Sequence, residues 1–198
     1  MSDSPSPKHE PPEIPALEQR LPVVMVETPH PATLHPDRLL ESCGLRTQRR
    51  SGPGGQHRNK TSSGAFLHYS PTNTTAEATE RRSQADNRKV ALERLRFRLA
   101  VEVRSPSPMD GYEVGSQEQE LRTRFEGQSL KISDRNRDKP AVLALLMNDL
   151  HVCGGQPSAV GPVWDTSTSA IVRLIKSHPN AFTLLNRIRQ HHDRLPLR

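Results

Sequence analysis

The chain has 198 residues, of which 28 are Lys or Arg and 22 are Asp or Glu, so its formal net charge is +6. Only 32% of the residues are hydrophobic, 4% are aromatic and 18 are prolines. This composition argues against one large core and favours a small domain, a second weaker one and disordered connections. No apolar run approaches the roughly 20 residues that span a bilayer, which argues against a membrane protein.

The positive charge is concentrated in one part of the chain. Residues 36–104 contain 14 basic and 7 acidic side chains, whereas residues 1–35 contain 2 and 5, and residues 105–198 contain 12 and 10. A cationic surface attracts a polyanion such as RNA without regard to its sequence. We therefore expect residues 36–104 to bind RNA, with a solvated helix surface as the alternative for any single Arg.

The first 35 residues are rich in Pro, Ser and Glu, which predicts a disordered or loosely extended tail. Their beginning, MSDSPSPKHEPPEIP, lacks the basic-then-apolar order of a secretory signal. Val23–Val26 is suited to a short strand, but no partner strand can be identified. Cys43 and Cys153 lie far apart in the sequence, which is typical of a reducing cytoplasm, with a disulfide as the less favoured alternative.

Residues 36–104 predict a small α+β domain. Asp37–Cys43 is expected to form about one helical turn anchored by Leu39 and Leu40, and Gly44–Arg50 to run extended into a Gly-rich loop. Apolar and polar residues then alternate through Ala65–Thr79 around the turn residues Pro-Thr-Asn, which indicates a β-hairpin.

A change to helical periodicity follows the hairpin, and we expect one helix over Arg81–Arg104 that lays an apolar stripe on the hairpin. The stripe consists of Ala91, Leu92, Leu95 and Leu99. The remaining surface is expected to carry Arg82, Arg88, Lys89, Arg94, Arg96 and Arg98.

The run SPSPMDG, residues 105–111, ends this helix and places a domain boundary there. We expect a linker over 105–118 and a helical region over 119–198, with helices at Pro140–Leu150, after a cap at Ser167 or Thr168, and from Pro179. These helices resemble a helix-turn-helix module. Pro162 counts against that resemblance, because it lies where the middle helix would be.

Two motifs point to a known family. The run RRSGPGGQHRNKTSS, Arg49–Ser63, contains Gly-Gly-Gln after Ser-Gly-Pro and before His-x-Asn-Lys-Thr, and Glu80–Leu99 contains Arg-Ser-Gln-x-x-Asn followed by basic residues. Both motifs, in this order and about twenty residues apart, resemble the catalytic domain of peptide-chain release factors. The resemblance covers roughly residues 36–104.

The resemblance implies hydrolysis of the ester that joins a nascent peptide to tRNA within the ribosome. Gly54, Gly55 and Gln56 would form the catalytic loop, in which the Gln56 main-chain N–H stabilises the oxyanion and the Gln56 side chain selects water. Family members are methylated on this Gln, which implies N-methylation of Gln56 by a glutamine methyltransferase. A general-base role for His57 is disfavoured, because no neighbouring acid orients the ring in the sequence and stacking on RNA is the simpler expectation.

Other positions of the two motifs are expected to bind RNA or to shape the backbone. The RNA-binding set is Arg49, Arg50, Arg58 and Lys60 around the loop, with Arg82, Arg88 and Lys89 on the helix. Asn59 and Thr61 are expected to cap the turn after the loop. Ser83, Gln84 and Asn87 open the helix, where a structural role and RNA contact are both open.

Two short matches are interpreted as decoys. Pro31-Ala32-Thr33 matches a stop-codon-reading tripeptide of one release-factor type, but it lies too close to the loop in sequence to decode while the loop catalyses. Gly154-Gly155-Gln156 repeats the catalytic tripeptide without its flanking residues, and a glycine pair ending a helix is the better interpretation.

The remaining patterns exclude other chemistry. His191-His192 and His151-x-Cys153 lack structural zinc spacing, and no Gly-x-Ser-x-Gly or P-loop motif occurs, so we expect neither metal nor cofactor. The sequence predicts a codon-independent peptidyl-tRNA hydrolase of the ribosome, in a bacterial cytoplasm or, as the second choice, an organellar matrix. The alternatives are a non-hydrolytic ribosome-binding paralogue and a nucleic-acid-binding regulator that works through the C-terminal helices.

Overall fold

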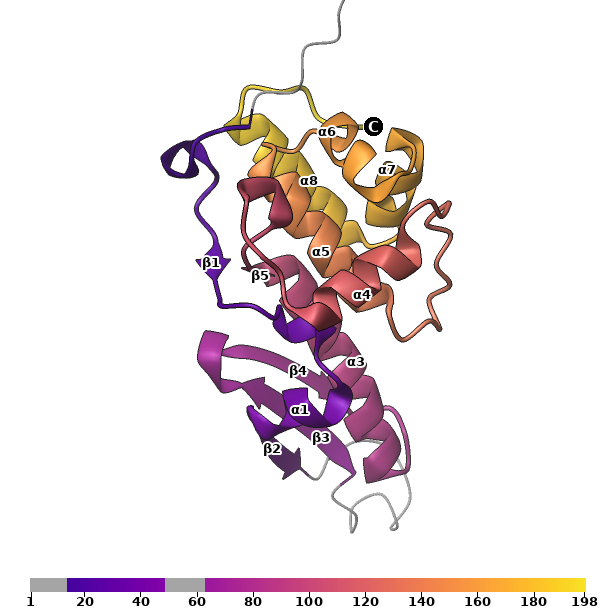
Figure 1. Cartoon of the computed structure of the whole chain (residues 1–198). Coiled ribbons are helices and arrows are strands. Elements are labelled where there is room, and N and C mark those ends of the chain that lie inside the picture. Colours follow the sequence, from indigo (N-terminus) through magenta and orange to yellow (C-terminus); the bar gives the residue numbers. More distant parts are fainter. Residues whose placement is uncertain (1–13, 49–62) are drawn as a thin grey trace, which may run out of the picture.

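The computed structural model describes residues 14–48 and 63–198. Figure 1 shows a small β-sheet covered by the long helix α3 at one end of the molecule and a group of helices around α5 at the other. The N-terminal segment runs along the side of both parts. None of the helices in the described ranges is both long and apolar enough to cross a bilayer.

The sheet has three antiparallel strands in the order β2 (Cys43–Gln48), β3 (Gly64–Tyr69) and β4 (Thr74–Ala78). Alternate residues of β3 and β4 are buried, as the period of two requires when one face packs against a helix. A 3-10 helix over Ser70–Thr72 and the left-handed Asn73 (φ 55°) make the turn between β3 and β4. The predicted hairpin is confirmed, and so is the predicted extended segment as far as Gln48; its last two residues, Arg49 and Arg50, lie outside the described residues.

Helix α3 (Gln84–Glu102) confirms the predicted long helix with shorter ends. It begins after Ser83 because the Ser83 side chain accepts a hydrogen bond from the amide of Asp86 at 3.3 Å. The predicted apolar stripe is buried, and α3 packs on β3, β4 and α5. One expectation was wrong: Arg96 is buried, with 9% of its surface exposed, because its guanidinium donates to the carbonyls of Ala32 and Arg137.

The N-terminal segment differs from the predicted disordered tail over residues 14–35. It contains the 3-10 helices Leu17–Gln19 and Pro31–Thr33, and it leads into α1 (Pro36–Glu41). Strand β1 (Val24–Met25) pairs in parallel with β5 (Val103–Arg104), the partner that sequence could not identify. The segment is ordered because distant residues satisfy its backbone, as when Glu118 Oε1 accepts from the amide of His30 at 2.6 Å.

The C-terminal helices surround α5 (Lys139–Val152), in which every residue is buried. Helices α3, α4, α6, α7 and α8 all contact it. The other C-terminal elements are the 3-10 helices Pro108–Asp110 and Pro162–Trp164 and the helices α4 (Ser116–Phe125), α6 (Pro157–Val160), α7 (Thr168–Lys176) and α8 (Pro179–His191). The cap expected at Ser167 or Thr168 is Ser167, and the helix start expected at Pro179 is confirmed, whereas α4 begins inside the segment expected as a linker. The helix-turn-helix resemblance stays a prediction.

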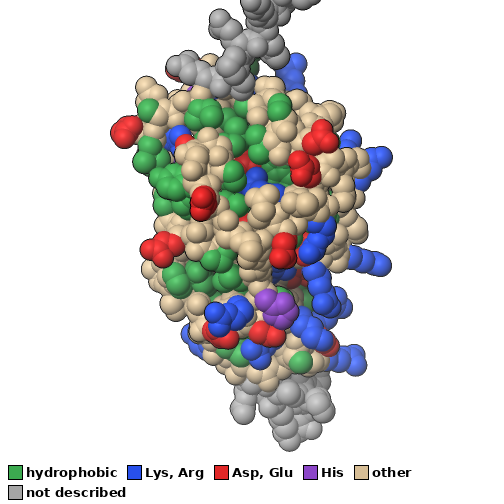
Figure 2. All heavy atoms as spheres, in the orientation of Figure 1, with side chains coloured by type: hydrophobic (Ala, Val, Ile, Leu, Met, Phe, Trp, Pro, Cys, Tyr) green, Lys and Arg blue, Asp and Glu red, His purple; other side chains and the backbone are tan. Residues whose placement is uncertain are grey.

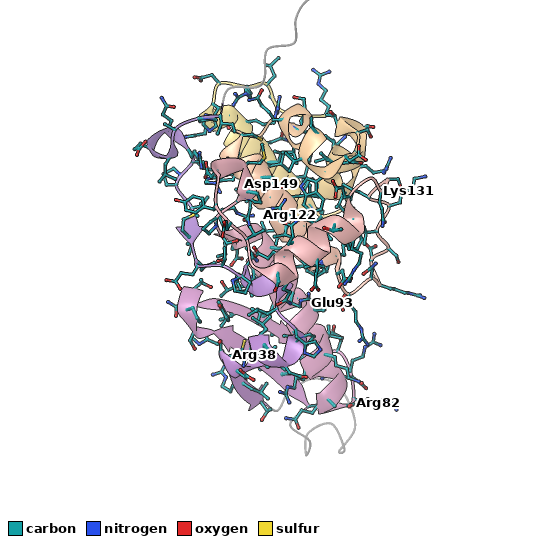
Figure 3. All side chains as sticks on the ribbon, viewed as in Figure 1. Arg38, Arg82, Glu93, Arg122, Lys131 and Asp149 are labelled. Carbon is teal, nitrogen blue, oxygen red and sulfur yellow. The ribbon has the colours of Figure 1, made fainter. Side chains whose placement is uncertain are left out.

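Buried hydrophobic side chains form one continuous cluster from the sheet to the C-terminal helices, contrary to the expectation that composition precludes a large core. This core also contains alanines and a buried polar network. Asp149, near the centre of Figure 3, accepts from both Arg122 terminal nitrogens (2.8 and 2.9 Å) and from Ser107 Oγ and Trp164 Nε1 (both 2.6 Å). Because each charge has its partners, burial of this network is tolerated. Cys43 and Cys153 are free thiols, so the disulfide alternative is excluded.

Candidate functional site

The predicted catalytic residues lie outside the described residues. These are Gly54, Gly55 and Gln56, and with them lie the RNA-binding candidates Arg49, Arg50, Arg58 and Lys60 and the flanking His57, Asn59 and Thr61. The structure describes instead the residues that connect to them, Gln48 and Ser63, and the parts of the fold that hold these two residues in place.

The two chain ends at the loop are held side by side by the sheet. Gln48, the last residue of β2, pairs with Gly64, the first residue of β3. A Cβ on Gly64 would lie 3.0 Å from the carbonyl oxygen of Gln48 and 3.1 Å from Cγ2 of Thr79. Glycine is therefore required for this close approach. Sequence reasoning missed Gly64, although its position between the loop and an alternating strand was an available signal.

Asn87 fastens the returning chain to helix α3. Its buried side chain donates from Nδ2 to the carbonyls of Ser63 (2.6 Å) and Arg81 (2.9 Å), and Oδ1 accepts from the amide of Arg81 (2.9 Å). Both Nδ2 hydrogens are used and the side chain is completely buried, so it cannot reach RNA. Of the two roles that the sequence left open for Asn87, the structure supports the structural one.

The basic side chains nearest the loop are exposed at the start of α3. Arg82, which Figure 3 places at the loop end of the molecule, and Arg88 and Lys89 form no ion pair with any residue in 14–48 or 63–198. Farther along α3, Arg94 binds Glu80 at 2.6 Å and Arg98 binds Glu102 at 2.9 Å. The arrangement therefore leaves positive charge available beside the loop and neutralises it farther away.

A hollow of about 510 Å³ lies between α1, β2 and α3. Arg88 and Lys89 line it together with Asp37 and an apolar floor that includes Leu40 and Leu92. Basic side chains beside an apolar floor suit a nucleic acid, because the cations contact phosphates while the floor accepts a sugar or base.

Ionisation of Cys43, at the end of β2 opposite the loop, argues against a side-chain nucleophile there. Burial raises the pKa of the Cys43 thiol to about 11, and its Sγ donates to the carbonyl of Leu39 at 3.2 Å. The thiol is therefore protonated and unreactive at neutral pH. Among the residues that the structure describes, no three His, Cys, Asp or Glu side chains gather as metal ligands do.

The structure separates both decoy tripeptides from the loop. Pro31, Ala32 and Thr33 are buried in a 3-10 helix, so they cannot reach a codon. Gly154 and Gly155 follow α5 with φ of +60° and +75°, and the amide of Gly155 donates to the carbonyl of Leu150 at 2.7 Å. The prediction of a helix-ending glycine pair is confirmed.

Comparison with known proteins identifies the same region. Residues 40–139 match the RF-1 domain. A 53-residue segment is 51% identical to peptide chain release factor 2 of Acidovorax sp. (strain JS42), covering 27% of this chain and 14% of that protein. A 55-residue segment is 44% identical to the mitochondrial peptide chain release factor 1-like protein of Rattus norvegicus, covering 28% and 15%.

A third relative, peptide chain release factor 1 of Symbiobacterium thermophilum, is 42% identical over 60 residues, which are 30% of this chain and 17% of that protein. The matched segments thus cover less than a fifth of each relative. The domain match covers half of this chain, and it spans the sheet, α3 and α4. The chain therefore belongs to the RF-1 domain family, that of the peptide chain release factors.

Proposed function

We propose that the protein hydrolyses peptidyl-tRNA on the ribosome, independently of a codon, through Gly54-Gly55-Gln56. One observation carries the proposal: the sheet pairs Gln48 with Gly64, and Asn87 of α3 fastens the preceding residue, Ser63, by a hydrogen bond to its carbonyl. Such a base positions a loop relative to the rest of the molecule, which is what catalysis by main-chain groups requires.

The chemistry needs no ionisable catalyst. Water attacks the ester carbonyl, and the main-chain N–H of Gln56 stabilises the negative charge that develops on the oxygen. Gly54 and Gly55 allow close approach to the reacting centre, and the side chain of Gln56 admits water in preference to other nucleophiles. No cofactor takes part.

Basic side chains on both sides of the loop bind large-subunit RNA in this proposal. Arg49, Arg50, Arg58 and Lys60 flank the tripeptide in sequence. Arg82, which lies two residues before α3, and Arg88 and Lys89 on α3 are exposed without ion pairs in the described ranges. Methylation of Gln56 by a glutamine methyltransferase belongs to the same proposal. We place the protein in a bacterial cytoplasm, or else in an organellar matrix, because its relatives include bacterial and mitochondrial release factors.

Codon independence is supported by the burial of Pro31-Ala32-Thr33, the tripeptide of this chain that matches a decoding motif. Without an exposed reading element of that type in residues 14–48 and 63–198, release would depend on the vacancy of the ribosomal site and not on its codon. Equal activity with and without a stop codon is therefore expected.

The test uses purified ribosomes that carry peptidyl-tRNA, with either a stop codon or no codon in the vacant site. We expect peptide release in both cases. Replacement of Gly55→Ala should reduce the rate by about 10² or more, because it disturbs the approach of the Gln56 main-chain N–H to the oxyanion. Gln56→Ala keeps that N–H and should instead lower the preference for water over other nucleophiles. Gln156→Ala is the matched control, because it alters the second copy of the tripeptide, and it should retain full activity.

Three outcomes would overturn the proposal: no release by the wild-type protein, release with a stop codon only, or loss caused by Gln156→Ala and not by Gly55→Ala. Ribosome binding without turnover would identify a non-hydrolytic paralogue instead.

A further inference from the structure

We propose that the connection between α4 and α5, residues 126–138, forms a second RNA-binding surface that anchors the protein to the ribosome away from the catalytic loop. Lys131, Arg135 and Arg137 are its phosphate-binding side chains. The proposal rests on the proposed function for the identity of the RNA, but it concerns a different part of the molecule.

The charges of this connection divide into paired and unpaired groups. Asp138 binds Arg124 at 2.8 Å, and Asp134 binds Lys139. Lys131, Arg135 and Arg137 are exposed and form no ion pair with the described part of the chain. Glu126 is the remaining acid of the connection, so the surface keeps an excess of positive charge.

The backbone that carries these cations is fixed in place by hydrogen bonds. Asn136 accepts from the amide of Asp138 through Oδ1 at 2.8 Å, and its own amide donates to the carbonyl of Ser133 at 2.9 Å. At the start of the connection, Arg173 of α7 donates to the carbonyl of Ser129 at 2.7 Å. A prearranged surface loses less conformational entropy when it binds than a free loop does.

Arg96 joins this surface to the predicted RNA-binding part of α3. Its buried guanidinium donates to the carbonyl of Arg137 at 2.7 Å, so Arg137 lies beside the middle of α3. Lys89 lies seven residues before Arg96, which corresponds to about 10 Å along the helix axis. The catalytic loop base and the connection are therefore close enough for one RNA surface to contact both.

Figure 3 labels one cation of each set, and both lie on the same side of the molecule. In Figure 3, Lys131 and Arg82 both project to the right, with Glu93 between them. Figure 2 shows Lys and Arg side chains projecting along this same edge. An edge of separated cations suits a polyanionic backbone, to which Arg donates in a fork and Lys as a point charge.

The experiment measures binding of the full-length protein to ribosomes without peptidyl-tRNA, at several salt concentrations. The variant Arg135→Ala/Arg137→Ala keeps the backbone hydrogen bonds of the connection. The control Arg187→Ala/Arg198→Ala removes the same charge from exposed residues of α8 and the chain end. Deproteinised large-subunit RNA serves as a second probe.

We expect the Arg135→Ala/Arg137→Ala variant to bind about tenfold more weakly near 0.1 M salt, with the slope of log K against log salt reduced by about 1.4 to 1.8, as for two lost phosphate contacts. The control variant should lose less than half as much affinity for ribosomes. The unfolding midpoints of both variants should match that of the wild type. The same change of slope is expected with deproteinised RNA.

An unchanged slope, or an equal loss in the control, would overturn the proposal. A loss seen on ribosomes but not on RNA would indicate a ribosomal protein as the partner and would overturn it too. Absence of peptide release by a wild-type protein whose binding still depends on Arg135 and Arg137 would refute the proposed function alone. Normal release with unaltered binding by the variant would refute the RNA-binding surface alone.

Discussion

Asn87 shows how one side chain can fix the chain at the point where a loop returns to the fold. Its amide is the sole side chain hydrogen-bonded to both the returning chain at Ser63 and the start of α3 at Arg81 among the described residues. Each of these bonds satisfies a backbone group that would otherwise be left without a partner. Asn87 is therefore a positioning residue, and its loss should be felt at the loop.

We expect Asn87→Ala to lower the free energy of unfolding by about 1–3 kcal/mol, because it leaves backbone polar groups without partners. Urea denaturation measures this loss. Single-turnover peptide release should fall about tenfold or more, since a displaced loop loses its orientation. Asn180→Ala, at an exposed position of α8, is the control and should change neither quantity. Wild-type stability of Asn87→Ala would refute the structural role.

His30 is a second residue whose role depends on complete burial. Its Nδ1 accepts from the amide of Ala32 at 3.0 Å, so Nε2 carries the proton and donates to the carbonyl of Val103 at 3.1 Å. Burial and the neighbouring Arg104 cation lower the pKa of His30 to about 3. The imidazole is thus neutral in the folded protein across the physiological range.

This pKa predicts a loss of stability in mild acid. Below the ordinary pKa of 6.5 the unfolded chain binds a proton that folded His30 cannot, so the free energy of unfolding falls as pH decreases from about 6.5 towards 3. Between pH 7 and pH 5 the fall due to His30 is about 2 kcal/mol. Chemical denaturation at each pH should show a shallower dependence for His30→Gln than for the wild type.

Glu118 has the opposite effect on the pH dependence of stability. Burial raises the pKa of its carboxyl, so the contribution of the protonated carboxyl to the free energy of unfolding is lost as pH rises above the ordinary value of 4.5. The difference between the wild type and His30→Gln at each pH isolates His30, since Glu118 is common to both. Parallel curves for the two proteins would show that His30 does not titrate as described.

At the scale of elements, local periodicity decided which parts the sequence could predict. The β3–β4 hairpin and α3 carry regular apolar patterns, and both were predicted. Helix α4 was missed because its sequence, SQEQELRTRF, is mostly polar and offers only Leu121 and Phe125 as apolar anchors. A buried carboxylate, Glu118, lies on its inner face and reads as a surface residue in sequence.

The N-terminal segment was misjudged for a different reason. Proline-rich composition predicts disorder, yet the order of residues 14–35 comes from partners far away in sequence. Arg96 was assigned to the surface by residue type, although two carbonyls satisfy its charge in the interior. At the candidate site the motif residues of α3 could be identified from sequence, whereas the roles of Asn87 and Gly64 required the three-dimensional partners.

At the scale of the whole molecule, α3 joins the sheet to the C-terminal helices through one continuous core. The predicted division into a unit over 36–104 and another over 119–198 can therefore be tested by asking whether the two parts unfold cooperatively. Trp164, the single tryptophan, is buried among the C-terminal elements and reports on that part alone.

We expect the two parts to unfold together. Leu67→Ala removes a side chain from the sheet core that is 1% exposed, and it should cost about 2–5 kcal/mol. In urea, the midpoint from Trp164 fluorescence should fall together with the midpoint from circular dichroism. Leu45→Ala, on the neighbouring strand and 43% exposed, is the control with a small expected effect. If Leu67→Ala left the midpoint from Trp164 fluorescence unchanged, the two parts would be independent units.

Contacts of the N-terminal segment also determine when folding can be completed during synthesis of the chain. The carbonyls of Gln19 and Leu21 accept hydrogen bonds from His191 and His151, which lie 172 and 130 residues later. At translation rates of about 5–20 residues per second, Gln19 waits about 10 to 30 s for His191. The first described part of the chain to emerge is thus among the last to dock, so the fold closes only after His191 has been synthesised.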